Sequence, residues 1–167
     1  MAETFRLKMN QDLAERIRGH GAETFPYECC GALLGRDSAA GEKVNPAGSE
    51  RSESPRETPR EVLDLFPLVN RRDDSPRNRF AVTAADVRDA EKAAREHGLE
   101  VIGWYHSHPD HPARPSQFDR EHAWPWYSYV IVSVLSGTPA EMTSWRLNDD
   151  REDYTAENIE IRNRALA

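Results

Sequence analysis

Four of the six histidines of this 167-residue chain fall within 17 residues: His106, His108, His111 and His122. The first two directly follow residues 101–105, an apolar segment typical of a β-strand. If that strand continues through His108, the first two imidazoles point to the same face, because side chains alternate along a strand. Two converging imidazoles supply two ligands for a divalent metal ion. A His-x-His pair is weak support by itself, so the hypothesis requires a third ligand. His111 and His122 are interpreted as surface groups or as neighbours of the ligands.

Asp119 is the leading candidate for this third ligand. Three prolines after the histidines stiffen a turn, and the chain then returns in a short helix predicted over residues 115–123. Ser116 and Asp119 are three residues apart and share one face of that helix. A His, His, Asp set with an open fourth position is typical of catalytic zinc, which lowers the pKa of bound water to about 7. Taken singly, Asp119 is most often a solvated helix residue and Ser116 is most often an N-cap.

Glu28 is the candidate for a general base. This carboxylate lies between Pro26 and residues 31–34, an apolar run that we interpret as a buried strand. A carboxylate at the edge of a buried element is suited to accept a proton from water, whereas exposure near a turn is the simpler interpretation of Glu28 alone. The two cysteines, Cys29 and Cys30, are adjacent and poorly placed for a structural disulfide. We interpret Cys30 as a small buried residue.

Several other catalytic motifs are absent from the sequence. It contains no His-Glu-x-x-His, no Cys-x-x-Cys, no Gly-x-x-x-x-Gly-Lys loop and no Gly-x-Ser-x-Gly elbow. These absences argue against helical zincins, zinc nucleobase deaminases, P-loop nucleotide hydrolases and α/β-hydrolases. Metal-assisted hydrolysis is the chemistry that survives.

Hydrophobic periodicity and capping residues predict helices interleaved with strands, which indicates an α/β or α+β fold. Thr83 can cap the clearest helix and Gly98 can end it. The tryptophans Trp104, Trp124 and Trp126 are interpreted as core or rim packing, with one of them lining a substrate groove as the alternative. The predicted helices cover residues 10–20, 83–98, 115–123 and 155–166, and the predicted strands cover residues 28–35, 62–69, 80–82, 101–105, 127–135 and 142–147.

The length favours one domain, which we assign to residues 1–150, followed by a tail, residues 151–167, that could be helical. Residues 45–61 hold three prolines and dense charge, so we expect a mobile loop there. Residues 71–79 carry four arginines and are also expected to form a loop. Solvated connections are the simpler interpretation of both loops, and a docking surface for a partner is the alternative.

Composition bounds the partners and the compartment. Lys and Arg total 22 against 29 Asp and Glu, which gives a formal net charge of −7 and argues against a general nucleic-acid binder. No run approaches the roughly 20 apolar residues of a transmembrane helix, and the first residues lack the apolar middle of a secretory signal. We therefore expect a soluble, cytoplasmic protein that binds neither nucleic acid nor membrane.

Taken together, Glu28, the pair His106 and His108, and the pair Ser116 and Asp119 closely resemble the JAMM motif of the MPN-plus (Mov34/MPN/PAD-type) metallopeptidases. None of these five positions is substituted in this chain. The flanking runs PYECCGALLG and PSQFDREHAWPWYSYVIVSV are also similar to the small bacterial members that process sulfur-carrier proteins.

The resemblance implies a single MPN/JAMM domain with a cytidine-deaminase-like mixed β-sheet flanked by helices. It also implies one Zn²⁺ ion per chain, held by His106, His108 and Asp119 with water as the fourth ligand. Glu28 would activate that water, and Ser116 would stabilise the oxyanion of the tetrahedral intermediate.

The substrate that the resemblance implies is a ubiquitin-like sulfur-carrier protein with a C-terminal Gly-Gly. The enzyme would hydrolyse the amide bond after that Gly-Gly and release cysteine or another residue. The alternatives are a hydrolase of small substrates, a broader deubiquitinase-like peptidase, a non-catalytic module that binds the carrier, and a protein in which zinc only staples the fold. Structural zinc is least favoured, because it is normally closed by four protein ligands.

Overall fold

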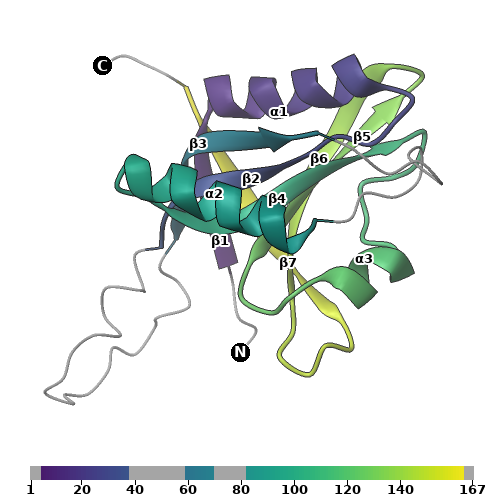
Figure 1. The fold of residues 1–167 in the computed structure, drawn as a ribbon. Helices are drawn as coiled ribbons and strands as arrows, with labels where there is room; N and C mark the ends of the chain where they lie inside the picture. The colour runs from purple at the N-terminus through teal and green to yellow at the C-terminus, as the bar shows by residue number, and fades with distance from the viewer. Residues whose placement is uncertain (1–4, 38–58, 70–81, 164–167) are drawn as a thin grey trace, which may run out of the picture.

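The computed structural model describes residues 5–37, 59–69 and 82–163. Within these ranges, helices are interleaved with strands along the chain, as the hydrophobic periodicity predicts (Figure 1). No helix in the described ranges is both long and apolar enough to cross a membrane. The elements are β1 (Phe5–Asn10), α1 (Gln11–Thr24), β2 (Cys30–Asp37), β3 (Arg60–Leu68), α2 (Ala84–Glu96), β4 (Glu100–Pro109), α3 (Gln117–His122), β5 (Ser128–Leu135), β6 (Thr138–Leu147) and β7 (Tyr154–Arg162).

The strands form one mixed sheet that closes on itself in the order β1-β3-β2-β4-β5-β6-β7. Strand β4 pairs antiparallel with β2 and parallel with β5, and the ring is completed by parallel pairing of β7 with β1. The predicted fold class, an α/β domain with a mixed sheet and flanking helices, is confirmed. The closure of that sheet into a barrel is an addition from the structure.

The C-terminal segment differs from its prediction. The helix predicted over residues 155–166 is wrong, because Tyr154–Arg162 forms strand β7 between β6 and β1. Thr155, Ile159 and Ile161 are β-branched residues, which favour a strand wherever the backbone finds partners on both sides. The partner β1 was itself not predicted, so this part of the expected tail is built into the barrel.

Smaller differences concern the ends of elements and the loops. Helix α1 continues past Gly21 to Thr24. Gly21 does not end the helix but allows it to pack closely on β5, since an added Cβ would lie 3.0 Å from a methyl of Val134. The expected loop over residues 45–61 ends earlier, since Arg60 and Glu61 already belong to β3. The rest of that loop, up to residue 58, lies outside the described residues, as does the loop predicted over residues 71–79. Of the strand predicted over residues 80–82, only Val82 is described, and it is not in a strand.

A buried polar network ties β7 to the other strands. Arg60 is almost fully buried and donates a hydrogen bond to Ser128, whose hydroxyl in turn donates to Glu157 on β7. Glu157 also accepts hydrogen bonds from Ser144 and Arg146. Because buried charges persist only when they are paired and hydrogen-bonded, this network explains why a polar segment lies inside the barrel wall.

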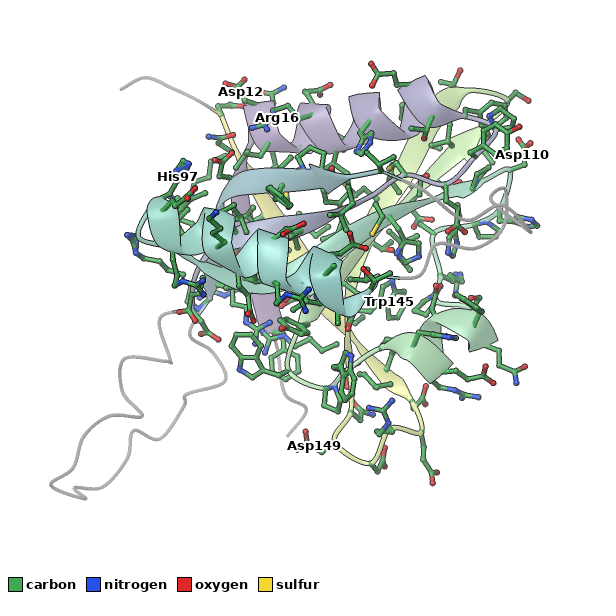
Figure 2. The ribbon with its side chains drawn as sticks, viewed as in Figure 1. Asp12, Arg16, His97, Asp110, Trp145 and Asp149 are labelled. Atoms are coloured by element: carbon green, nitrogen blue, oxygen red, sulfur yellow. The ribbon has the colours of Figure 1, made fainter. Side chains whose placement is uncertain are left out.

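The two faces of the sheet pack against different helices. One buried cluster joins α1 to residues such as Leu33 and Tyr105, and a second joins α2 to residues such as Cys30 and Trp104. The opposite side of α1 faces outward, as the labelled Asp12 and Arg16 show (Figure 2). Alternation along β4 therefore assigns Trp104, and every second residue after it, to the face that carries α2.

Helix α2 begins with a complete capping box. The Thr83 hydroxyl accepts a hydrogen bond from the backbone N–H of Asp86, and the Asp86 carboxylate accepts one from the N–H of Thr83. We expect Thr83→Ala to lower the free energy of unfolding by about 1 kcal/mol, whereas Thr83→Ser, which keeps the hydroxyl, stays close to the original value. Urea denaturation followed by circular dichroism measures both. Equal stability of the alanine and serine variants would contradict this assignment.

Candidate metal centre

His106 and His108 come from the C-terminal end of β4, on the α2 face of the sheet. The strand runs to Pro109, so the alternation expected from the sequence places both rings on one face. Their Nε2 atoms lie 3.2 Å apart. The backbone of a single strand is therefore sufficient to bring the two imidazoles together.

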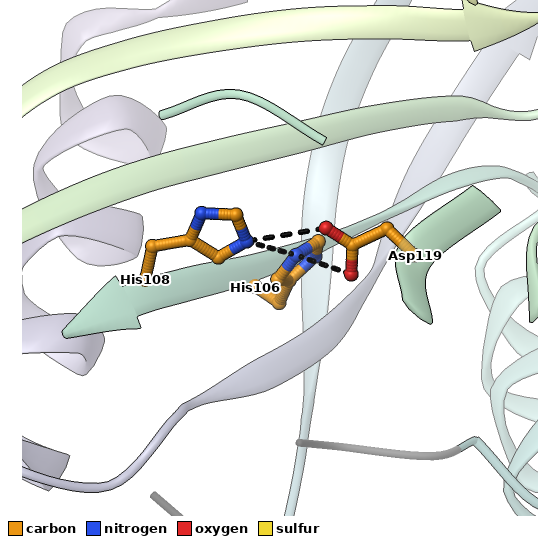
Figure 3. Close-up of side chains that lie close together, drawn as sticks. All are labelled: His106, His108 and Asp119. Carbon is orange, nitrogen blue, oxygen red and sulfur yellow. Dashed lines mark hydrogen bonds and ion pairs between the residues drawn. The ribbon is translucent and has the colours of Figure 1, made fainter. Parts of the chain in front are cut away.

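Asp119 reaches the same point from helix α3. Ser116 is the N-cap of this helix, and its hydroxyl accepts a hydrogen bond from the N–H of Asp119 at 3.1 Å. The Asp119 carboxylate accepts one from the N–H of Ser116 at 2.8 Å. This capping box fixes the Asp119 side chain with Oδ1 3.3 Å from Nε2 of His106 and Oδ2 3.2 Å from Nε2 of His108. Figure 3 shows the three side chains pointing toward one another.

The spacing of these three groups fits a tetrahedral zinc ion. Zinc binds nitrogen and oxygen ligands at about 2.0–2.2 Å, so two ligands at tetrahedral positions lie about 3.3–3.6 Å from each other. The two Nε2 atoms lie 3.2 Å apart, and they lie 3.3 Å and 3.2 Å from Oδ1 and Oδ2 of Asp119, distances at or just below the lower end of that range. No fourth His, Cys, Asp or Glu joins this group among the described residues. The set could therefore hold zinc with one position open.

The tautomer of His108 also suits a ligand. Its Nδ1 lies 2.8 Å from the carbonyl oxygen of Pro112, which can only accept a hydrogen bond. Nδ1 must therefore carry the proton, and in the neutral ring Nε2 then presents a lone pair toward His106 and Asp119. The Pro112 carbonyl is a part of the site that the sequence analysis missed, because a backbone acceptor leaves no signal in residue types.

Asp119 is held in its ionised form. Burial opposes ionisation, but the neighbouring side chains of His106 and His108, together with the hydrogen bond from the Ser116 backbone, keep the pKa of Asp119 well below its ordinary value. An ionised carboxylate is the form that binds a metal ion. The electrostatics of the cluster thus agree with its geometry.

Glu28 lies beside this cluster, two residues before the start of the neighbouring strand β2. Cys30 of β2 pairs with His106 of β4 in antiparallel register, and the N–H of Ser107 donates to the carbonyl of Cys29. Two residues further in each direction, Glu28 and His108 are opposite each other on the same face. Glu28 is buried, and this burial raises the pKa of its carboxyl to about 8, with His108 acting to lower it.

The other candidate residues lie outside the cluster. His122 stacks on Phe118 of its own helix, and its Nδ1 lies 2.9 Å from the Phe118 carbonyl oxygen. Cys29 and Cys30 are free and buried, and burial raises the pKa of the Cys29 thiol to about 12. This agrees with the interpretation of Cys30 as a small buried residue. His111 is not one of the three grouped residues.

A cavity of about 980 Å³ opens directly on the cluster, with His106 and Asp119 in its wall. Trp104 is buried in this wall, while Trp124 and Trp126 are 64% and 38% exposed. The tryptophans thus combine packing with the lining of a groove. Sequence reasoning missed the contribution of the β6–β7 connection and β7, whose lining residues are Arg151 and Tyr154.

Comparison with known proteins agrees with this arrangement. The family model described as prokaryotic homologs of the JAB domain matches residues 10–148. The chain belongs to this family. Among curated proteins, the JAB-domain chain is similar to desampylase of Haloferax volcanii, with 29% identity over 133 residues that cover 77% of this chain and 81% of the relative.

Solved structures support the fold of this JAB domain. A protein of Salinibacter ruber is 42% identical, with a TM-score of 0.64 over 96% of this chain and 94% of its own. A protein of Desulfitobacterium hafniense is 28% identical, with a TM-score of 0.71 over 94% and 93%. A JAB1/MPN domain protein from Archaeoglobus fulgidus, 17% identical with a TM-score of 0.52 over 93% and 98%, shares the fold.

Proposed function

We propose that this JAB-family chain is a zinc-dependent peptidase or isopeptidase that acts on a ubiquitin-like sulfur-carrier protein. The reaction is hydrolysis of the amide bond after the carrier's C-terminal Gly-Gly, with release of cysteine or another residue. The observation that carries the proposal is the grouping of His106, His108 and Asp119, in which the two Nε2 atoms lie 3.2 Å apart and each lies 3.2–3.3 Å from one oxygen of Asp119, beside the buried carboxylate of Glu28.

His106, His108 and Asp119 would hold the ion, one per chain. When bound, zinc supplies a Lewis acid that acidifies water and polarises a carbonyl oxygen. Metal sites that serve only structure are normally closed by four protein ligands, whereas this group has three. The open position therefore favours a catalytic over a structural role.

Glu28 serves as the proton carrier. Its carboxylate accepts a proton as a water molecule attacks the carbonyl carbon, and it delivers that proton to the leaving amine nitrogen as the C–N bond breaks. The products are a carrier that ends in the Gly-Gly carboxylate and a released residue whose amino group is an ammonium, so that both protons of the water end on the amine nitrogen. A carboxyl with a pKa of about 8 is suited to both steps, because proton transfer is most effective when the pKa lies near the working pH.

Ser116 is proposed to stabilise the negative charge that develops on the former carbonyl oxygen. Its hydroxyl oxygen already accepts the N–H of Asp119, so the hydroxyl hydrogen stays available as a donor beside the cluster. Donors of this kind contribute about 2.7–4 kcal/mol to catalysis in a studied hydrolase.

One relative supports the class of substrate, and the motif residues support the type of reaction. The relative named desampylase supports an activity on conjugates of ubiquitin-like proteins, and the JAMM-like residues support amide hydrolysis. The relative also favours a second candidate function, a broader isopeptidase that cleaves a ubiquitin-like protein from lysine side chains.

The proposal is tested on the zinc-loaded full chain with two substrates that share the same carrier protein and differ only in what is joined to its Gly-Gly. One is a ubiquitin-like sulfur carrier that ends in Gly-Gly-Cys, and the other is the same carrier joined through Gly-Gly to a lysine side chain. Mass spectrometry should show loss of cysteine from the first, and chelation should stop it. Cleavage of the second alone selects the broader isopeptidase, and binding without any cleavage would leave a carrier-binding module.

A further inference from the structure

The cavity beside the metal cluster is larger than the space that an extended Gly-Gly tail would fill, and its lining is mostly apolar. Helices α2 and α3, strands β2, β4, β5 and β7, and the connections before β5 and β7 contribute to its lining. The aromatic lining comes from Trp104, Phe118, Trp124, Trp126, Tyr127, Tyr129 and Tyr154. Apolar cavities of this size typically receive a ligand's hydrophobic part, with a few polar groups to orient it.

The aromatic wall is held in place before any ligand enters. Tyr127 makes edge-to-face contacts with Trp104, Trp126 and Tyr129, at centroid distances of 5.9 Å, 5.4 Å and 6.4 Å. The Tyr129 hydroxyl also accepts the backbone N–H of Trp124 at 2.8 Å. A wall fixed in this way loses little conformational entropy on binding.

Trp126 has further support from the buried network of the barrel. The Arg60 guanidinium lies 4.3 Å from the centroid of its ring, within the range of a cation–π contact. The backbone of Trp126 has a φ of 97°, which a bulky residue adopts only when its surroundings impose it. The contact with the buried Arg60 therefore holds the partly exposed Trp126 ring in the wall of the cavity.

The position of the cavity determines which part of a substrate can enter it. His106 and Asp119 belong to its wall, so whatever fills it lies next to the bond that is cleaved. The two glycines on the acyl side of that bond carry no side chains. The nearest side chain is that of the residue on the amine side, which is the residue released.

We propose that this cavity binds the side chain of the released residue and selects a large apolar one. This inference rests on the proposed function for the direction of the substrate. Phe118 and Trp126 form the part of the wall on which selectivity depends most, because Phe118 lines the cavity from α3, the helix that also carries Asp119, and Trp126 has the rigid support described above.

Binding and cleavage are measured separately with a matched pair of probes, acetyl-Gly-Gly-Phe and acetyl-Gly-Gly-Ser. The two peptides have the same charge and backbone, so they differ only in the side chain. Calorimetric titration of the full chain in chelator, where no cleavage competes, should show about tenfold or tighter binding of the phenylalanine peptide. On the zinc-loaded chain, carriers with the same two endings should differ in kcat/KM in the same direction.

The variants Trp126→Ala and Phe118→Ala should each reduce the preference for phenylalanine to less than about threefold. Leu63→Ala is the matched control, because Leu63 is 41% exposed and lies outside the cavity lining; it should keep the preference. Circular dichroism verifies that each variant is folded, and Trp126→Phe, which keeps an aromatic ring, should retain most of the preference.

Equal affinity for the two peptides would overturn the inference, as would tighter binding of acetyl-Gly-Gly joined to the lysine side chain. These results are distinguishable from a failure of the proposed function. A side-chain preference in binding without any cleavage would refute the hydrolase and leave only the cavity's preference for a large apolar side chain standing. Cleavage of both carriers at equal kcat/KM would support the hydrolase and refute the cavity assignment.

Discussion

We expect the chain to bind about one zinc ion, and Asp119→Ala is expected to remove it. The carboxylate supplies the only anionic atom of the three-residue group and lies within 3.3 Å of both histidine nitrogens. Loss of an outer-shell partner alone typically lowers metal affinity about 10–100-fold, so the loss of a direct ligand should exceed that. Elemental mass spectrometry and competition with a chelator measure content and affinity, and His108→Ala should give the same result.

Two controls separate metal loss from damage to helix α3. Asp119→Asn keeps an oxygen that can accept the N–H of Ser116, so it preserves the helix cap while removing the negative charge. We expect it to lose zinc as well. His97→Ala removes an exposed imidazole at the end of α2, away from α3, and should leave the metal content unchanged (Figure 2). Equal zinc in His97→Ala and Asp119→Ala would rule out the ligand assignment.

The parts of the site that sequence reasoning could predict are local ones. His106 and His108 share a face because a strand has a period of two, and Ser116 and Asp119 face each other because a capping box spans three residues. Both relationships follow from backbone geometry over a few residues. The structure brings His106, His108 and Asp119 together in the way those spacings predict.

The parts of the fold and site that depend on pairing between distant strands were harder to predict from the sequence. The position of Glu28 opposite His108 results from the register of β2 against β4, which no local pattern encodes. Similarly, β7 is a strand because β1 and β6 offer it hydrogen-bonding partners, whereas the sequence analysis predicted a helix over residues 155–166. Glu157 illustrates the difficulty, since its carboxylate is buried only because Arg146 and two serines surround it.

The cavity falls between these two cases. Trp124 and Trp126 could be recognised as possible groove residues from their type, but Tyr154 comes from a strand that the sequence did not predict. The wall therefore combines a local aromatic run with a distant strand. Only the closed sheet brings them to the same side of the metal cluster.

Glu28→Gln is expected to abolish nearly all turnover while leaving zinc in place. Glutamine has the shape of the glutamic acid side chain but cannot accept and pass on a proton, so catalysis loses its general base. The rate should fall by about 10²–10⁴-fold, the usual contribution of a positioned base. Hydrolysis of the carrier followed by mass spectrometry measures kcat, and elemental analysis of the same sample measures zinc.

This pair of readouts makes the role of Glu28 separable from that of the ligands. A ligand variant loses both zinc and turnover, whereas Glu28→Gln should lose turnover alone, because Glu28 is not one of the three grouped residues. Glu96→Gln, an exposed position on α2, is the matched control and should retain full activity. Full activity in Glu28→Gln would refute the assigned base, and loss of zinc in that variant would move Glu28 from proton transfer to metal binding.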